Sequence, residues 1–71
     1  MASFELISAV QDYEKYISNN GINEQVIELY CDAAKVSIET EKDIEYGLSL
    51  TKRAKEIIET LVLNMTGSDI W

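Results

Sequence analysis

Proline is absent from this chain, and glycine occurs at three positions among 71 residues. These two residues interrupt regular helices, so their scarcity favours long helices joined by short connections. A chain of this length buries about 60% of its unfolded surface, which is enough for one small core. The hydrophobic content of 46% supports such a core and argues against a disordered acidic chain. We therefore expect a single acidic helical domain over residues 1–71.

Capping residues place the boundaries of two helices in the first half of the chain. Ser3 is a suitable N-cap for a helix over about 4–18, and Asn19-Asn20-Gly21 tolerates the left-handed backbone that ends one. Asn23 is a suitable N-cap for a second helix over about 24–38. Because a handful of residues joins the two helices, we expect an antiparallel or steeply crossed pair.

A longer apolar pattern predicts a third helix over about 41–65, with Thr40 as its N-cap. Gly47 is the weakest position of this helix, because glycine costs up to about 1 kcal/mol relative to alanine in a helix interior. The sequence allows a bend or a break near Gly47. Gly67 is expected to end the helix. The predicted fold class is therefore all-α, a small three-helix domain.

Apolar residues repeat at steps of three and four along each predicted helix, which puts them on one face. We expect these faces to form the core. They comprise Phe4, Ile7, Val10, Tyr13 and Ile17 in the first helix, with Leu6 and Tyr16 widening the stripe, Val26, Ile27, Tyr30, Ala33, Ala34, Val36 and Ile38 in the second, and Ile44, Leu48, Thr51, Ala54, Ile58, Leu61 and Met65 in the third, with Leu50, Ile57 and Val62 beside them. Cys31 is expected to be small and partly buried.

Charge is strongly negative and unevenly placed. Thirteen acidic residues against six basic ones give a net charge of −7. Residues 1–51 hold ten acids and three bases, a balance of −7, whereas residues 52–71 hold three of each, a balance of zero. This field disfavours direct binding to nucleic acid or to an anionic membrane and favours basic partners. The alternative explanation is that the negative charge only keeps the protein soluble.

One cluster of basic residues, Lys52, Arg53 and Lys55, raises the question of a nucleic-acid-binding helix. Glu56 and Glu59 flank the cluster, and the charge of the whole chain repels DNA. Salt bridges within the helix or to its neighbours account for the cluster better.

Carboxylates follow the second predicted helix and the start of the third. Acids three or four residues apart on a helix repeat at about 4.5–6 Å, and two such helices side by side can imitate DNA phosphates, which occur about every 1.7 Å of helix axis. The candidate partner-binding residues are Asp12, Glu14, Glu24, Glu28, Asp32, Glu39, Glu41, Asp43, Glu45 and the aromatic Tyr46. For each acid the alternative is a solvated helix face.

The sequence offers no catalytic constellation, metal site or cofactor site. Histidine is absent, so Cys31, the single cysteine, lacks the base that would activate it. The acidic run 39–45 alternates like a calcium loop, but Ile44 stands where that loop needs glycine and Leu50 where it needs the bidentate acid. We expect a protein that is not an enzyme and binds neither cofactor nor metal ion.

The size, acidity and helicity are also similar to those of acyl carrier proteins. Those proteins carry their prosthetic group on the serine of an Asp-Ser-Leu motif. Here Leu48 precedes Ser49 and Leu50, so the diagnostic aspartate is missing. This resemblance therefore ranks behind the two functions given below.

The start of the chain, Met1 to Glu5, lacks the basic region and apolar run of a signal peptide. The longest apolar run, residues 61–63, is far shorter than the roughly 20 residues that cross a bilayer. A lone cysteine fits a reducing compartment. We expect a soluble cytoplasmic protein.

In size, predicted helicity and charge, the whole chain resembles the small acidic proteins that bacteriophages make early in infection to disable host factors. The residues that carry the resemblance are Glu24, Glu28 and Asp32 and the acidic run 39–45. Several proteins of that type mimic DNA, and one similar case fills the DNA-binding saddle of the histone-like nucleoid protein HU. The resemblance implies an inhibitor of HU that competes with DNA in the host bacterial cytoplasm.

Two functions of different classes remain. The first is a non-enzymatic inhibitor whose carboxylates block the DNA-binding surface of a basic host protein, an HU-like protein being favoured. The alternative is a small helical adaptor or regulatory subunit whose apolar face, including Trp71 and the third helix, binds a partner. Binding of the first kind should weaken steeply with salt, whereas apolar packing should change little. The sequence leaves a homodimer open in either case.

Overall fold

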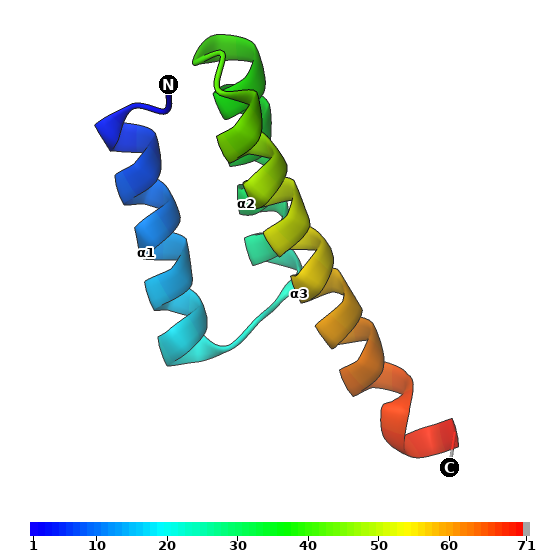
Figure 1. Cartoon of the computed structure of the whole chain (residues 1–71). Helices are drawn as coiled ribbons and strands as arrows, with labels where there is room; N and C mark the ends of the chain where they lie inside the picture. The colour runs from blue at the N-terminus through cyan, green and yellow to red at the C-terminus, as the bar shows by residue number, and fades with distance from the viewer. Residues whose placement is uncertain (71) are drawn as a thin grey trace.

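The structure, a computed structural model, describes residues 1–70, with side chains for residues 1–65. Three α-helices and one π-helical turn follow one another along this part of the chain (Figure 1). They are α1 (Phe4–Asn20), α2 (Glu24–Lys35), the π-helix η1 (Val36–Thr40) and α3 (Ile44–Ile70). The predicted all-α, three-helix fold is confirmed.

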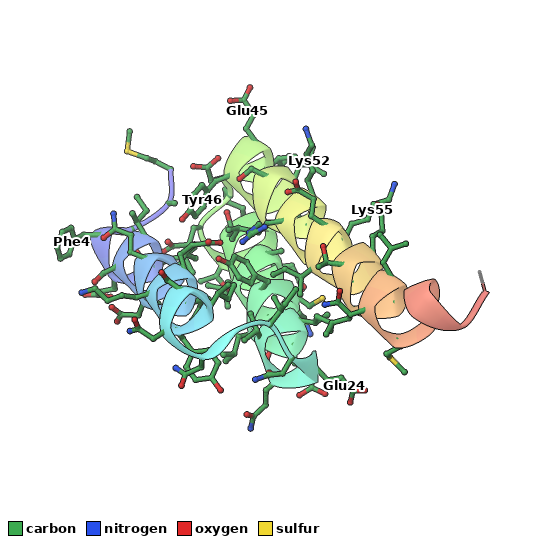
Figure 2. The ribbon with its side chains drawn as sticks, turned by 90° about the horizontal axis from the view of Figure 1, so that it is seen from below. Phe4, Glu24, Glu45, Tyr46, Lys52 and Lys55 are labelled. Atoms are coloured by element: carbon green, nitrogen blue, oxygen red, sulfur yellow. The ribbon has the colours of Figure 1, made fainter. Side chains whose placement is uncertain are left out.

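The helices form an elongated molecule of 45 × 22 × 14 Å. α2 lies between α1 and α3 in the view of Figure 2, and it packs most extensively against α3. α3 is the longest element, at 27 residues against 17 for α1. Its C-terminal part extends beyond the ends of the other helices (Figure 1).

The caps of α1 match the prediction from the sequence. The Ser3 hydroxyl accepts the amide N–H of Leu6 at 3.2 Å, which satisfies one of the free donors of the first turn. At the other end, Gly21 has φ +84° and donates its N–H to the carbonyl of Ile17 at 2.8 Å. A side chain is disfavoured in that backbone conformation, so glycine is suited to end the helix. The helix runs to Asn20, two residues beyond the predicted end.

α2 begins as predicted but ends differently. Asn23 caps it by accepting the amide N–H of Val26 at 3.1 Å. The α-helical pattern stops at Lys35, and the next five residues form η1, closed by a bond from the Glu41 amide to the Val36 carbonyl at 3.0 Å. The predicted helix over 24–38 is therefore an α-helix followed by one wide π turn.

The connection into α3 is organised by Ser37 and Asp43. Ser37 is fully buried; its hydroxyl donates to the Asp43 carbonyl at 2.7 Å, and its carbonyl accepts the Asp43 amide at 2.8 Å. Lys42, with φ +57°, reverses the chain between them. The Asp43 carboxylate then accepts the Tyr46 amide at 3.0 Å. Asp43 is thus the N-cap of α3, and the expected cap, Thr40, is instead the last residue of η1.

α3 continues without interruption through Gly47, where a bend or a break was allowed, and through Gly67, where an end was predicted. Gly47 is buried because α3 approaches the end of α2 and η1 closely there. A Cβ atom built on Gly47 would lie 2.8 Å from Ile38 Cδ1 and 3.2 Å from the Ala34 carbonyl oxygen. The glycine therefore permits close helix packing rather than a kink.

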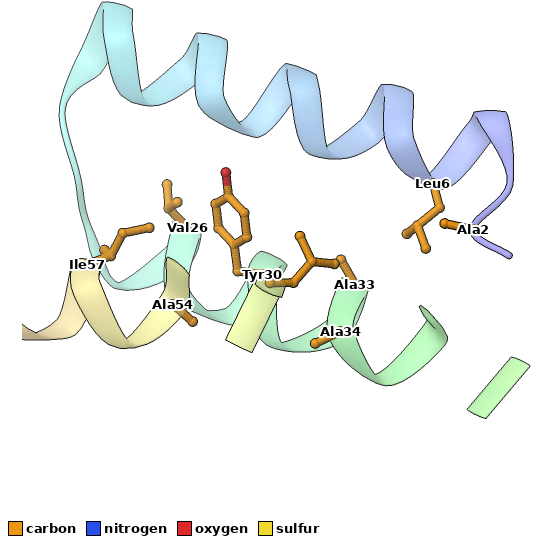
Figure 3. Close-up of a cluster of buried hydrophobic side chains, with 9 residues drawn as sticks. Ala2, Leu6, Val26, Tyr30, Ala33, Ala34, Ala54 and Ile57 are labelled. Carbon is orange, nitrogen blue, oxygen red and sulfur yellow. The ribbon is translucent and has the colours of Figure 1, made fainter. Parts of the chain in front are cut away.

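The core lies where α2 faces its two neighbours (Figure 3). Tyr30 points from α2 toward α1, and its ring meets that of Tyr13 edge to face, with centroids 5.5 Å apart. The buried apolar residues are Ala2, Leu6, Val26, Tyr30, Ala33, Ala34, Leu50, Ala54 and Ile57. Val10, Tyr13, Ile17, Ile22, Ile27, Tyr46 and Leu61 pack against them while partly exposed.

Several residues predicted for the core are exposed instead. In α1 these are Phe4 and Ile7, whereas Leu6, expected at the edge of the stripe, is buried, and in η1 Val36 is exposed as well. In α3, Ile44, Leu48, Ile58 and Met65 are exposed. The buried face comprises Ala54 of the predicted stripe, Leu50 and Ile57, which were expected beside it, and Gly47. That buried face contains the small residues Gly47 and Ala54, which let the backbone of α3 come close to α2. Both faces have helical spacing, so periodicity could not choose between them.

Candidate acidic surface

A line of carboxylates runs along the outer side of α2. Glu24, Glu28 and Asp32 are spaced by four residues, which places successive acids about 6 Å apart along the helix. All three side chains are exposed. Among the residues that the structure describes, none of the three is within ion-pair distance of a lysine or arginine. Like charges at this spacing destabilise a helix by roughly a few tenths of a kcal/mol. The stability of α2 therefore does not explain why the three acids follow one another.

Three more of the predicted residues also present exposed carboxylates. Glu39 lies on η1, Glu45 in the first turn of α3, and Asp12 on α1. Glu24 and Glu45 project at opposite sides of the molecule in Figure 2. A shallow groove next to η1 is lined by Asp32, Lys35, Val36, Glu39 and Thr40. The exposed acids therefore extend from the start of α2 past η1 to α3.

The carboxylate of Glu14 is bonded to side chains of the two other helices. Its carboxylate accepts two bonds from Arg53 of α3, at 2.8 and 3.1 Å, and one from the hydroxyl of Tyr30. The hydrogen bond from the Arg53 guanidinium is the main cause that lowers the pKa of Glu14; burial opposes it, and the Tyr30 hydroxyl contributes a further, smaller lowering. The sequence could not reveal this role, because Arg53 is 39 positions away.

Glu41 and Asp43 fasten the N-terminus of the chain. The Glu41 carboxylate accepts a hydrogen bond from the amide N–H of Ser3. The backbone carbonyl of Glu41 accepts one from the terminal amine of Met1 at 3.2 Å. The second oxygen of Asp43 accepts the amide of Ala2 at 2.8 Å. Backbone N–H donors lower the pKa of both carboxyls, chiefly Ser3 for Glu41 and Tyr46 for Asp43. Both acids therefore serve the fold, whatever else they bind.

Tyr46 is half-buried and packs against the core instead of standing out from the acidic run. Burial, followed by the charge of Asp43, raises the pKa of its hydroxyl. The aromatic residue that is most exposed in the described part of the chain is Phe4. Its spacing relative to the other apolar residues of α1 predicted a core position, so nothing in the local pattern indicated that Phe4 is exposed.

The basic cluster behaves as predicted for two of its residues. Arg53 bonds to Glu14, and the Lys55 ammonium lies 4.0 Å from the Glu59 carboxylate, four residues on in the same helix. Lys52 is exposed. Cys31, expected to be partly buried, is exposed as well.

Within the described residues, no three acidic, cysteine or histidine side chains converge on a point where they could hold a metal ion. None of the helices in this part of the chain carries an apolar stretch long enough to span a membrane. Trp71, expected as an anchor for a partner, lies outside the described residues.

Comparison with protein-family models, with curated proteins and with solved structures gives no match for this chain. The geometry and the charge of the exposed surface are therefore the features from which a function can be inferred.

Proposed function

We propose that this protein is a non-enzymatic inhibitor that presents an acidic helical surface to a basic DNA-binding protein and blocks its DNA binding. The observation that carries the proposal is the row of Glu24, Glu28 and Asp32, exposed along α2 and, among the described residues, in no ion pair with a lysine or arginine. An HU-like nucleoid protein is the favoured target, because the resemblance noted for the sequence implies it.

The spacing of the row suits a surface built to bind DNA. One DNA strand carries a phosphate about every 3.4 Å of helix axis, and the acids of α2 recur at about 6 Å, close to every second phosphate. Lysine and arginine side chains are long and flexible enough to adapt to that difference. The lysine and arginine side chains of a DNA-binding groove could therefore pair with these carboxylates as they pair with phosphates.

The distribution of charge supports the same proposal. All of the net charge of −7 lies in residues 1–51, and residues 52–71 balance to zero. The excess negative charge thus lies on α1, α2, η1 and the start of α3, and the rest of α3 is balanced, which orients the approach of the molecule to a basic surface. Association of this kind is fast, and it weakens steeply as salt rises.

The structure reduces the set of residues assigned to the surface. Glu14, Glu41 and Asp43 bond to other parts of the chain, so their replacement would disturb the fold and the surface together. The carboxylates proposed for the partner are Asp12, Glu24, Glu28, Asp32, Glu39 and Glu45, all exposed. Of these, Glu28 and Asp32 lie in the middle of the row and are the sharpest choice for substitution.

A competition titration tests the proposal. HU is bound to a labelled DNA duplex, and this protein is added at low and at moderate salt. We expect release of DNA at low salt that fades at moderate salt. Glu28→Gln with Asp32→Asn should raise the concentration needed for release by roughly thirtyfold, since each of the two charge contacts contributes on the order of 1 kcal/mol.

The matched control removes two exposed acids elsewhere, Glu5→Gln with Glu56→Gln, and leaves the net charge of the two variants equal. Equal weakening by both pairs would mean that total charge, not the α2 row, determines binding. No release of DNA at either salt concentration would overturn the proposal for an HU-like target.

The second candidate, a helical adaptor, has one observation in its favour. Ile44, Leu48 and Ile58 leave apolar surface exposed along α3, and such a face is typical of helix-to-helix docking. Binding through it would survive moderate salt and would not respond to the Glu28 and Asp32 substitutions.

A further inference from the structure

Most of the exposed apolar residues of α3, Leu63 excepted, recur at a regular spacing. Ile44, Leu48, Ile58 and Met65 are 60%, 58%, 43% and 73% exposed, and Val62 falls in the same register. Together with Thr51 and Lys55 they occupy positions 44, 48, 51, 55, 58, 62 and 65, which alternate in steps of four and three. This is the spacing of the a and d positions of a coiled coil. We call these seven residues the outer stripe of α3.

The outer stripe is distinct from the face that α3 turns to the rest of the molecule. Leu50, Ala54 and Ile57 are buried against the core, and Arg53 reaches Glu14 of α1. Residues 51, 55 and 58 lie on the flank of α3 away from Arg53, because each residue turns the helix by about 100°. α3 therefore has one apolar face that the fold covers and one that it leaves exposed.

The total surface area of the chain exceeds that of a typical compact monomer of the same mass. A compact monomer of 8.0 kDa has an accessible surface of about 4,450 Å². This chain has 5277 Å², an excess of about 800 Å², which equals one side of a standard protein interface. The radius of gyration agrees: it is 13.5 Å, whereas about 11 Å is typical for this length.

We propose that two copies of the chain form a homodimer in which their α3 helices pack antiparallel through the outer stripe. A twofold axis near residues 56 and 57 sets Leu48 of each copy opposite Met65 of the other. The same axis sets Lys55 opposite Ile58. The interface is then self-complementary, as a twofold dimer requires.

Charge determines the orientation. In a parallel pair Lys55 would face Lys55 of the second copy, and two buried ammonium groups repel each other. In the antiparallel pair the methylene groups of Lys55 pack on Ile58, and its ammonium stays at the rim near Glu59. Lys52 of each copy then faces Glu59 of the other, which gives two complementary contacts.

The position of the axis also limits repulsion between the two chains. It crosses residues 52–71, where acids and bases balance, and the excess of ten acids over three bases lies in residues 1–51 of each copy. The acidic sides are then directed outward at the two ends of the dimer. The proposal is independent of the target of the acidic surface.

The mass of the full chain in solution tests the dimer, measured by sedimentation equilibrium without any partner protein. We expect a species of twice the 8.0 kDa monomer mass. Leu48→Glu with Ile58→Glu should raise the dissociation constant by about tenfold or more, since truncating a central contact typically costs over 1 kcal/mol. Circular dichroism checks that the variant keeps its helices, as expected for substitutions at exposed positions.

The control variant, Phe4→Glu with Leu63→Glu, adds the same charge at exposed apolar residues outside the stripe and should leave the dimer intact. A second test avoids apolar residues: Lys52→Glu should weaken the dimer, and adding Glu59→Lys should restore it. A wild-type chain that stays monomeric, or a dimer that the control disrupts and the stripe variant does not, would overturn the proposal.

Cross-linking determines the orientation. Chains carrying Lys52→Cys and chains carrying Glu59→Cys, each with Cys31→Ser, are mixed and oxidised. The antiparallel dimer predicts disulfides between the two kinds of chain. Disulfides between like chains would contradict the antiparallel arrangement. None of these outcomes depends on HU, so failure of the dimer and failure of the inhibitor function can be told apart.

Discussion

Arg53 of α3 and Glu14 of α1 form a two-bond ion pair, with Nε 2.8 Å from Oε2 and Nη2 3.1 Å from Oε1. The hydroxyl of Tyr30, on α2, donates to the same carboxylate. One carboxyl group thus connects all three helices at a point where the side chains of the pair are still about half exposed. Planar guanidinium and carboxylate groups are well suited to this geometry.

We expect Glu14→Gln to lower the free energy of unfolding by about 1 kcal/mol at neutral pH, because a partly exposed ion pair contributes little more than that. The pKa of Glu14 is lowered from 4.5 by Arg53 and Tyr30. Its contribution is therefore present above about pH 4.5 and is lost as pH falls through the lowered value. Urea unfolding at neutral and acid pH measures this. Lys55→Gln, which removes an exposed pair, serves as the control and should change stability little.

Tyr30 makes the stability depend on alkaline pH as well. Burial, and then the charge and hydrogen bond of Glu14, raise the pKa of its hydroxyl well above 10. The protein is therefore stabilised fully below about pH 10 and loses this contribution as pH rises further. Tyrosinate absorbance should show Tyr30 ionising together with unfolding. Tyr30→Phe should cost about 1 kcal/mol at neutral pH and reduce the alkaline loss; an unchanged alkaline profile would contradict the assignment.

Asp43→Ala should lower the urea midpoint, because it removes both the N-cap of α3 and the bond that holds Ala2. Thr40→Ala is the matched comparison, since sequence reasoning expected Thr40 to be the cap. It should have a small effect. The amides of Tyr46 and Ala2 lower the pKa of Asp43 from 3.8, so its contribution is present above about pH 3.8 and disappears as pH falls below that value. A larger loss from Thr40→Ala would mean that the cap is assigned wrongly.

Local chemistry explains what the sequence predicted well. Ser3, Asn23 and Gly21 act within three or four residues of themselves, so the start and end of α1 and the start of α2 follow from the residues alone. The end of α2 does not, because the chain after it is held by the hydrogen bond from the buried Ser37 hydroxyl of η1 to the Asp43 carbonyl, six residues further on. That contact exists only in the folded chain.

The sequence predicted which residues of α2 form the acidic row, but it did not predict which other acids are bonded within the fold. The exposed row on α2 follows from four-residue spacing, which survives in any helix that starts at Asn23. Glu14 is no longer assigned to the candidate surface, because it forms an ion pair with Arg53 of α3. A contact between two helices cannot be predicted from a local sequence pattern. In α3 two apolar stripes compete, and the choice between them depends on how closely Gly47 lets the helix approach its neighbour.

Gly47→Ala tests that close approach. In an isolated helix the substitution would stabilise by about 1 kcal/mol, because alanine has the higher helix propensity. In this fold the added Cβ would meet Ile38 and the Ala34 carbonyl oxygen, the latter at 3.2 Å. Overpacking of this kind typically costs about 1–3 kcal/mol, and the backbone carbonyl can yield less than a side chain can. We therefore expect a net loss in the free energy of unfolding.

A double-mutant cycle identifies the cause of that loss. Ile38→Ala alone removes packing and should destabilise, but with Gly47→Ala it opens space for the new methyl group. The double variant should therefore be more stable than the sum of the two single effects predicts, by about 0.5 kcal/mol or more. Ser49→Ala, at an exposed position of the same helix, gives the effect of alanine without a clash. If Gly47→Ala raised stability as Ser49→Ala is expected to do, α3 would not lie against Ile38, and the buried stripe of α3 would have to be reassigned.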